Sequence, residues 1–116
     1  MKLIQAYIKS HKLTDVLLAL QMVKGFNGMT TLPKRGIGWR VREADELFLS
    51  EGISNFEQGM KLEVLCEDEN AGRIFDTIRT IADTDTPGDG LVFQIDVEGF
   101  ARIETPAVGD GTGDAG

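Results

Sequence analysis

The stretch Met60-Lys61-Leu62-Glu63-Val64-Leu65-Cys66, together with the residues that follow Asp68, decides the fold of this chain. Its side chains alternate strictly between two sides, which predicts a half-buried strand. Asp68 is a good helix N-cap, and apolar residues then recur at helical intervals. These helical positions are Ala71, Ile74, Phe75, Ile78 and Ile81. A strand is therefore followed directly by an amphipathic helix.

The N-terminal part of the chain predicts the same order. Residues 2–9 alternate, with Ile4, Ala6 and Ile8 on one face, as in a strand. Residues 12–24 change to a helical stripe, which Gly25 and Gly28 end. Its apolar positions are Leu13, Val16, Leu17, Leu20 and Val23.

Two further strands complete the pattern. Met29 to about Gly38 is a Thr-rich run in which Pro33 favours an edge position or an irregularity. From Leu91 onward, Leu91, Phe93, Ile95 and Val97 alternate with more polar residues. Both runs predict strands.

The resulting order is β-α-β, a long loop, then β-α-β, which predicts an α+β, ferredoxin-like fold with a four-stranded antiparallel sheet. Residues 1–105 form this domain, residues 39–59 form the loop, and the Gly/Asp-rich residues 106–116 are expected to be a flexible tail. Two helices can cover only one face of the sheet. The other face is expected to be covered by oligomerisation.

Composition excludes several classes of protein. A length of 116 residues suits one domain, and a net charge of −7 argues against binding to nucleic acid. The chain has a single cysteine, Cys66, and no apolar run of membrane-spanning length, and its N-terminus soon turns polar. These features predict a cytoplasmic protein. No catalytic triad or acid–base pair can be assembled, so we expect no enzyme.

Three glycine-containing motifs are candidates for a binding site: Gly28-Met29-Thr30, Gly36-Ile37-Gly38 and Gly88-Asp89-Gly90. The turn at 86–90 can direct its backbone amides outward, toward an anion. Taken alone, Gly88-Asp89-Gly90 is more simply an ordinary turn. Gly36-Ile37-Gly38 lacks the third glycine and the strand-to-helix context of a dinucleotide fingerprint.

In joint order and spacing, these motifs resemble the PII family of trimeric signal-transduction proteins. The resemblance spans roughly residues 1–105 and includes Met1-Lys2-Leu3-Ile4, Lys61-Leu62-Glu63-Val64 and Arg102-Ile103. It implies a homotrimer that binds an adenine nucleotide in clefts between subunits. It also implies that the long loop, the T-loop of the family, controls a partner such as a membrane transporter or an enzyme.

The resemblance also implies two groups of binding residues. Residues expected around the base and ribose are Gly28, Met29, Thr30, Gly36, Ile37, Gly38, Glu63 and Leu65. Residues expected around the phosphates are Gly88, Asp89, Gly90 and Arg102. No metal site is expected.

Four family cations near the phosphates are replaced here. Thr86 and Leu91 stand at lysine positions, and Trp39 and Glu104 stand at arginine positions. Because charge-assisted hydrogen bonds contribute about 1.5–3 kcal/mol each, we expect ADP or AMP to be favoured over ATP, with ATP left open. The positions of the 2-oxoglutarate site and of the modified T-loop tyrosine also differ: they are Arg40, Gly59 and Gly52.

Two alternatives remain beside the sensor. A trimeric interaction module that has lost its ligand would agree with the replaced cations. A small protein associated with metal tolerance or efflux would agree with the N-terminal run His11 to Val16, which is similar to PII-like members found beside such systems. One histidine and one cysteine argue against a metal site in that protein.

Overall fold

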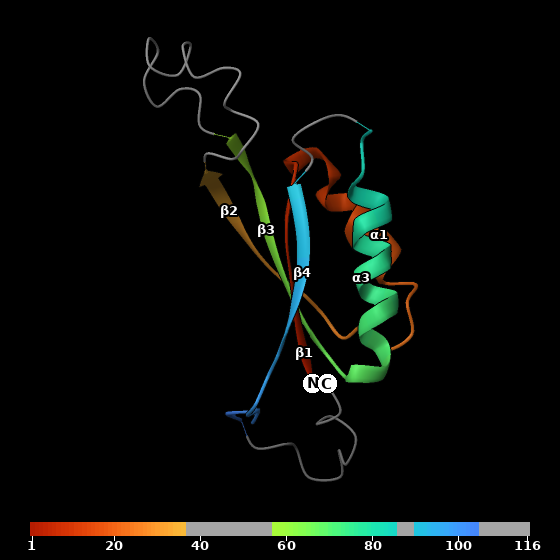
Figure 1. The fold of residues 1–116 in the computed structure, drawn as a ribbon, viewed down its shortest axis with the longest axis vertical. Coiled ribbons are helices and arrows are strands. Elements are labelled where there is room, and N and C mark those ends of the chain that lie inside the picture. Colours follow the sequence, from red (N-terminus) through yellow and green to blue (C-terminus); the bar gives the residue numbers. More distant parts are fainter. Residues whose placement is uncertain (37–56, 86–89, 105–116) are drawn as a thin grey trace.

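The computed structural model describes residues 1–36, 57–85 and 90–104. The elements follow the order β1 (Lys2–Ile8), a 3₁₀ turn η1 (Ser10–Lys12), α1 (Leu13–Leu20), β2 (Thr30–Gly36), β3 (Glu57–Cys66), α3 (Asp68–Ala82) and β4 (Gly90–Asp96). The strands form one antiparallel sheet in the order β2-β3-β1-β4. Both helices lie on the same side of it (Figure 1). The predicted ferredoxin-like α+β fold is confirmed.

The core lies between the sheet and the two helices. Alternate side chains of β1 and β3 face this layer, as their sequence alternation predicted. The buried residues are Ile4, Ala6, Ile8, Leu62, Val64 and Cys66 from the strands, Val16 and Leu20 from α1, and Ala71, Ile74, Ile78 and Ala82 from α3. The edge position that Pro33 predicted is also confirmed, because β2 is an outer strand.

The first helix is shorter than the predicted range of 12–24. It begins at Leu13 after the 3₁₀ turn and ends at Leu20. Beyond that point Met22 N–H donates to the Ala19 carbonyl and Val23 N–H to the Leu20 carbonyl, so the chain tightens into turns of the i→i+3 type. Val23 still packs against the core, although it lies outside the helix.

The third strand begins earlier than predicted, and the predicted loop 39–59 is correspondingly too long. Pairing with β2 extends β3 back to Glu57, which lies opposite Gly36, so residues 57–59 belong to a strand. A Cβ at Gly59 would overlap the Ile8 carbonyl oxygen, so close approach of β1 favours glycine there. The rest of the predicted loop and the tail 106–116 lie outside the described residues.

Asp68 does not cap the second helix as predicted. It is the first residue of α3, and the N-cap position belongs to Glu67, whose side chain makes no capping hydrogen bond. The carboxylate of Asp68 instead lies 2.7 Å from the amino nitrogen of Met1. This hydrogen bond lowers the pKa of the Asp68 carboxyl and raises the pKa of the Met1 amino group. Asp68 thus joins the start of α3 to the start of β1.

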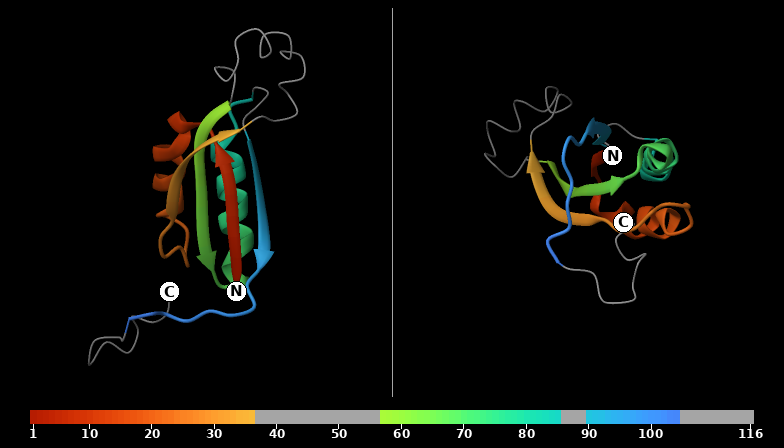
Figure 2. Two further views of the ribbon diagram at one scale, coloured as in Figure 1. Left: turned by 90° about the vertical axis from the view of Figure 1, so that its left-hand side faces the viewer. Right: turned by 90° about the horizontal axis from the view of Figure 1, so that it is seen from below.

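One side of the sheet, here called the open face, is not covered by either helix (Figure 2). Strand register places these residues on it: Leu3, Gln5 and Tyr7 of β1, Thr30, Leu32 and Lys34 of β2, Lys61, Glu63 and Leu65 of β3, and Leu91, Phe93 and Ile95 of β4. Leu32, Leu65, Leu91 and Ile95 are 41–54% exposed. The described part of one chain therefore leaves a second apolar surface uncovered.

The thiol of Cys66 gives a direct test of the core. The residue is 3% exposed, and burial raises the pKa of its thiol. We expect a thiol-specific disulfide reagent at pH 8 to react on the order of 100-fold more slowly with the folded protein than with the protein in denaturant. Reaction at the same rate in both conditions, followed by absorbance, would contradict this placement of β3.

Candidate functional site

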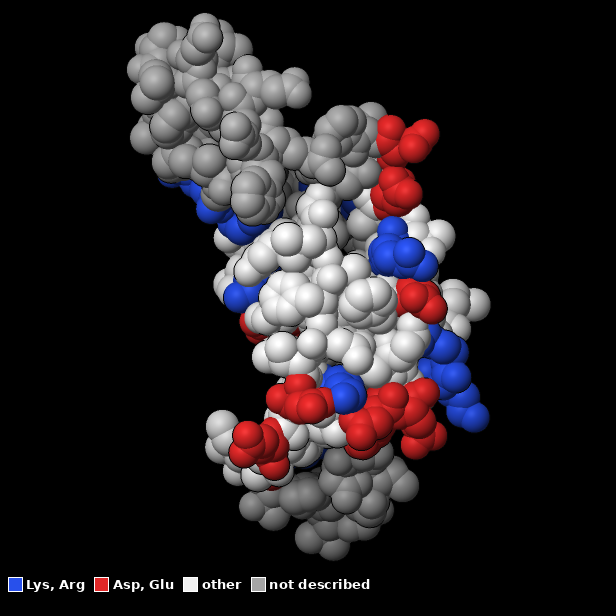
Figure 3. Space-filling model, in the orientation of Figure 1, with Lys and Arg blue, Asp and Glu red and all other residues white. Residues whose placement is uncertain are grey.

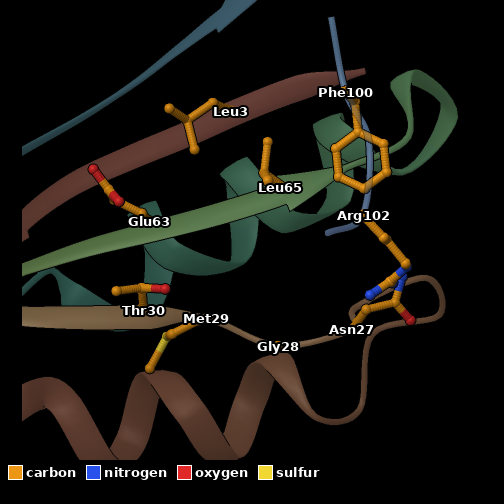
Figure 4. Close-up of a pocket in the computed structure, with 9 residues that line it drawn as sticks. All are labelled: Leu3, Asn27, Gly28, Met29, Thr30, Glu63, Leu65, Phe100 and Arg102. Carbon is orange, nitrogen blue, oxygen red and sulfur yellow. The ribbon is translucent and has the colours of Figure 1, made fainter. Parts of the chain in front are cut away.

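A pocket of about 280 Å³ lies at the end of the open face where β1 and β2 begin and β3 ends. It brings together segments that are far apart in the sequence (Figure 4). The lining residues are Leu3, Asn27, Gly28, Met29, Thr30, Glu63, Leu65, Phe100 and Arg102.

Apolar side chains separate two charged groups in this pocket. Leu3 and Leu65 lie opposite each other in the β1–β3 register. Phe100 and Arg102 come from the segment after β4, which is tied to the start of β1 where Val97 N–H donates to the Met1 carbonyl at 3.1 Å. Glu63 and Arg102 lie at opposite ends of the pocket (Figure 4). The pocket therefore offers a negative end, an apolar middle, and an end where the Phe100 ring lies beside the positive charge of Arg102 (Figure 4).

Two neighbours hold the carboxylate of Glu63. The Gln5 side-chain amide donates a hydrogen bond of 2.8 Å to Oε2, and Lys61 Nζ lies 3.4 Å from the same oxygen. All three side chains are on the open face, on the paired strands β1 and β3. Glu63 and Lys61 are each about one-third exposed or less, so their ion pair is partly shielded from water.

An aromatic group lies farther along the open face. The rings of Tyr7 and Phe93 are 6.2 Å apart and tilted by 54°. Lys34 Nζ lies 5.5 Å from the centre of the Tyr7 ring, within the range of a cation–π contact. The register places Phe93 level with Gln5 and Glu63, and Tyr7 level with Lys61, so this group begins beside the Glu63 end of the pocket.

Acidic side chains gather at the lower end of the molecule, and uncharged residues occupy the middle of the face shown in Figure 3. Asp96 at the end of β4 pairs with Lys2, and Asp68 pairs with the Met1 amino group. Within residues 1–36, 57–85 and 90–104, no three His, Cys, Asp or Glu side chains form a group that could hold a metal ion.

Six of the twelve predicted binding residues line the pocket: Gly28, Met29, Thr30, Glu63, Leu65 and Arg102. Gly36 and Gly90 do not. Gly90 lies opposite Ile8, five residues from Leu3 along β1, which corresponds to about 17 Å. Gly36 lies opposite Glu57 at the same far end of the sheet. Ile37, Gly38, Gly88 and Asp89 lie outside the described residues.

Leu3, Asn27 and Phe100 line the pocket but were not predicted as binding residues. Strand alternation could have indicated Leu3, because it puts Leu3 and Leu65 on one face. Asn27 directly precedes the predicted triplet at Gly28. Phe100 follows β4 in a segment without helix or strand, so no periodic pattern marks it.

Two of the positions that replace family cations are described. Leu91 is an exposed residue of the open face opposite Tyr7, and Glu104 is exposed near the end of the described chain. Trp39 and Thr86 lie outside the described residues. Arg102 is the only cationic residue among the described residues that line the pocket.

A family model, described as Nitrogen regulatory protein P-II, matches residues 1–107 of this chain. The chain belongs to the P-II family. It is 40% identical over 110 residues to the nitrogen regulatory protein P-II of Rhizobium meliloti (strain 1021), covering 94% of this chain and 96% of that protein. It is 38% identical over 116 residues to the nitrogen regulatory protein P-II of Azospirillum brasilense, covering 99% of each.

A third P-II relative, from Pasteurella multocida (strain Pm70), is 39% identical over 106 residues, with 90% of this chain and 93% of that protein covered. Membership of the P-II family gives this chain a role in regulation and signal transduction. No helix in the described parts of this P-II protein is long and apolar enough to cross a membrane.

Proposed function

We propose that this P-II protein is a cytoplasmic homotrimer that senses an adenine nucleotide in clefts between its subunits. We further propose that it controls a partner protein, with a membrane transporter as the expected partner, through the segment between β2 and β3 (residues 37–56), and that it catalyses no reaction. The observation that carries this proposal is the pocket at the edge of the open face, which contains six residues predicted from the family resemblance.

The open face supports association of several copies. Its exposed leucines and isoleucine form an apolar surface that water would otherwise contact. One chain also places Gly36 and Gly90 at the far end of the sheet from the pocket. In a cleft between two chains, Gly36 and Gly90 of one copy can approach a ligand in the pocket of another copy.

The pocket suits a nucleotide with few phosphates. The apolar middle and the Phe100 ring provide surface for a flat base, Glu63 can accept a hydrogen bond, and Arg102 can bind an anionic group. Leu91, where the family has a lysine, offers no charge to further phosphates. We therefore propose ADP or AMP as ligands in preference to ATP.

Calorimetric titration with AMP, ADP and ATP tests this function. We expect ADP or AMP to bind at least as tightly as ATP. Arg102→Ala should weaken ADP binding by about 10-fold or more, because it removes a charge-assisted hydrogen bond. Arg79→Ala is the matched control, since Arg79 is an exposed arginine of α3 that does not line the pocket and should leave the dissociation constant unchanged.

If none of the three nucleotides gave binding heat or a thermal shift, the proposal that the protein senses a nucleotide would be wrong. If binding of a partner were then independent of nucleotide, a trimeric interaction module would be the better description. The replaced cations at Leu91 and Glu104 favour that second candidate.

A further inference from the structure

The two groups that hold Glu63 both contact the same carboxylate oxygen. The Gln5 amide nitrogen is 2.8 Å from Oε2 and the Lys61 ammonium is 3.4 Å from Oε2. Neither contact uses Oε1. Within the described parts of the chain, these two contacts leave Oε1 of this pocket residue open to another donor.

A carboxylate held in this way discriminates between ligands. It accepts hydrogen bonds but donates none while ionised, so a donor facing it is stabilised and an acceptor facing it is repelled. Such discrimination needs a fixed carboxylate, because a free glutamate side chain can turn away from an unsuitable group. Gln5 supplies the fixed point with a short hydrogen bond from a neighbouring strand.

We propose that Gln5 is a positioning residue that holds Glu63 so that its Oε1 selects a ligand with a hydrogen-bond donor, such as the amino group of an adenine base, over a ligand with a carbonyl oxygen at the same place. The inference rests on the proposed function, because it concerns the nucleotide of the same pocket. Lys61 assists Gln5 by keeping a positive charge beside Oε2.

The geometry of the pocket sets the direction of the ligand. Arg102 lies at the end opposite Glu63, and the apolar residues Leu3 and Leu65 lie between them (Figure 4). An anionic phosphate is attracted to Arg102, so the base is directed toward Glu63. The edge of the base, rather than the phosphate, then contacts Oε1.

Calorimetry with ADP and inosine diphosphate tests this role, because inosine has a carbonyl oxygen in place of the amino group and a hydrogen on the adjacent N1. By calorimetry we expect the wild-type protein to bind ADP about 10-fold or more tightly than inosine diphosphate. Gln5→Leu keeps similar bulk but removes the amide. It should reduce this preference to about 3-fold or less, because Glu63 can then move away from the carbonyl group.

A second variant separates positioning from folding. Gln5→Glu places two carboxyl groups at hydrogen-bond distance, where they repel each other at pH 8 and share one proton at lower pH. We expect the preference for ADP to be lost at pH 8 and to return at pH 5.5, when the introduced carboxyl group can donate to Glu63. A purely structural defect would not be reversed by protons.

Among the residues whose side chains the structure describes, the other charged or titratable groups on this face or in its pocket are Lys61 on β3, Lys34 on β2, Tyr7 on β1, and Arg102 in the segment after β4. The matched control is Gln94→Glu, the same chemical change at an exposed position opposite Ile4 on the helix side of the sheet. The preference of this control variant for ADP over inosine diphosphate should equal that of the wild-type protein at pH 8 and at pH 5.5.

The outcomes separate the two proposals. If wild-type protein binds neither nucleotide, the nucleotide-sensing function fails. If wild-type protein binds ADP and inosine diphosphate equally well, or if Gln5→Leu keeps the full preference, the role of Gln5 is wrong and the nucleotide site stands. Circular dichroism confirms that each variant is folded at both pH values.

Discussion

Gly90→Ala is expected to lower the free energy of unfolding by about 3 kcal/mol. Gly90 has a φ of +118°, and a Cβ there would overlap the carbonyl oxygen of Tyr7 and lie 2.8 Å from its carbonyl carbon. Both atoms belong to the backbone of β1, a central strand, so they cannot move aside cheaply. The start of β4 would have to separate from β1.

Denaturant unfolding at a fixed protein concentration measures this effect. Gly99→Ala and Gly72→Ala are the controls, because an added Cβ meets nothing within 4 Å at either position. Gly99→Ala should change the unfolding free energy by less than about 0.5 kcal/mol, and Gly72→Ala, in α3, should raise it by about 0.5–1 kcal/mol. A change at Gly90 no larger than that at Gly99 would contradict the close approach of β4 to β1.

Ile95→Asp is expected to break the proposed trimer. Ile95 is 47% exposed on the open face, opposite Leu3. If copies associate through this face, the substitution buries an unpaired charge at each contact, which costs about 3 kcal/mol or more and raises the dissociation constant by about 100-fold. Sedimentation at micromolar concentration should then show the 12.7 kDa chain in place of a species three times that mass.

Leu18→Asp is the matched control for this prediction. Leu18 is 57% exposed on α1, and this helix lies on the side of the sheet away from the open face (Figure 1). The same change of an exposed apolar residue to aspartate should leave the sedimenting mass unchanged. Dissociation by Leu18→Asp but not by Ile95→Asp would place the contact on the helices and remove the argument for clefts beside the pocket.

Most of the fold could be predicted because the spacing of apolar residues along the chain indicates each strand and helix. Alternation along residues 60–66 gave the buried side of β3, and the helical stripe from Ala71 to Ile81 gave the face of α3. The element ends depended on contacts between distant segments. Pairing with Gly36 set the start of β3 at Glu57. The carboxylate of Asp68, which the sequence predicted to cap a helix, instead pairs with the Met1 amino group.

The candidate site could be predicted only in part. Gly28, Met29, Thr30, Glu63 and Leu65 lie on or beside paired strands, so their grouping follows from the sheet register. Phe100 reaches the pocket because the chain after Val97 crosses below the strands, and no pattern in the sequence encodes that path. The distance of Gly36 and Gly90 from the pocket was also not predicted, since a sequence motif does not reveal at which end of the sheet its residues lie.

The alternation of β3 has a consequence for how this protein can diverge. Glu63 and Leu65 face the pocket, whereas their neighbours Leu62 and Val64 are fully buried on the other side. Single substitutions at the outward positions can change the lining of the pocket without disturbing the interior. An insertion or deletion that slipped the strand by one residue would instead exchange the two sets, sending a carboxylate inward and turning a valine outward. The pocket can therefore change through single substitutions, whereas insertions or deletions within β3 would disrupt the core.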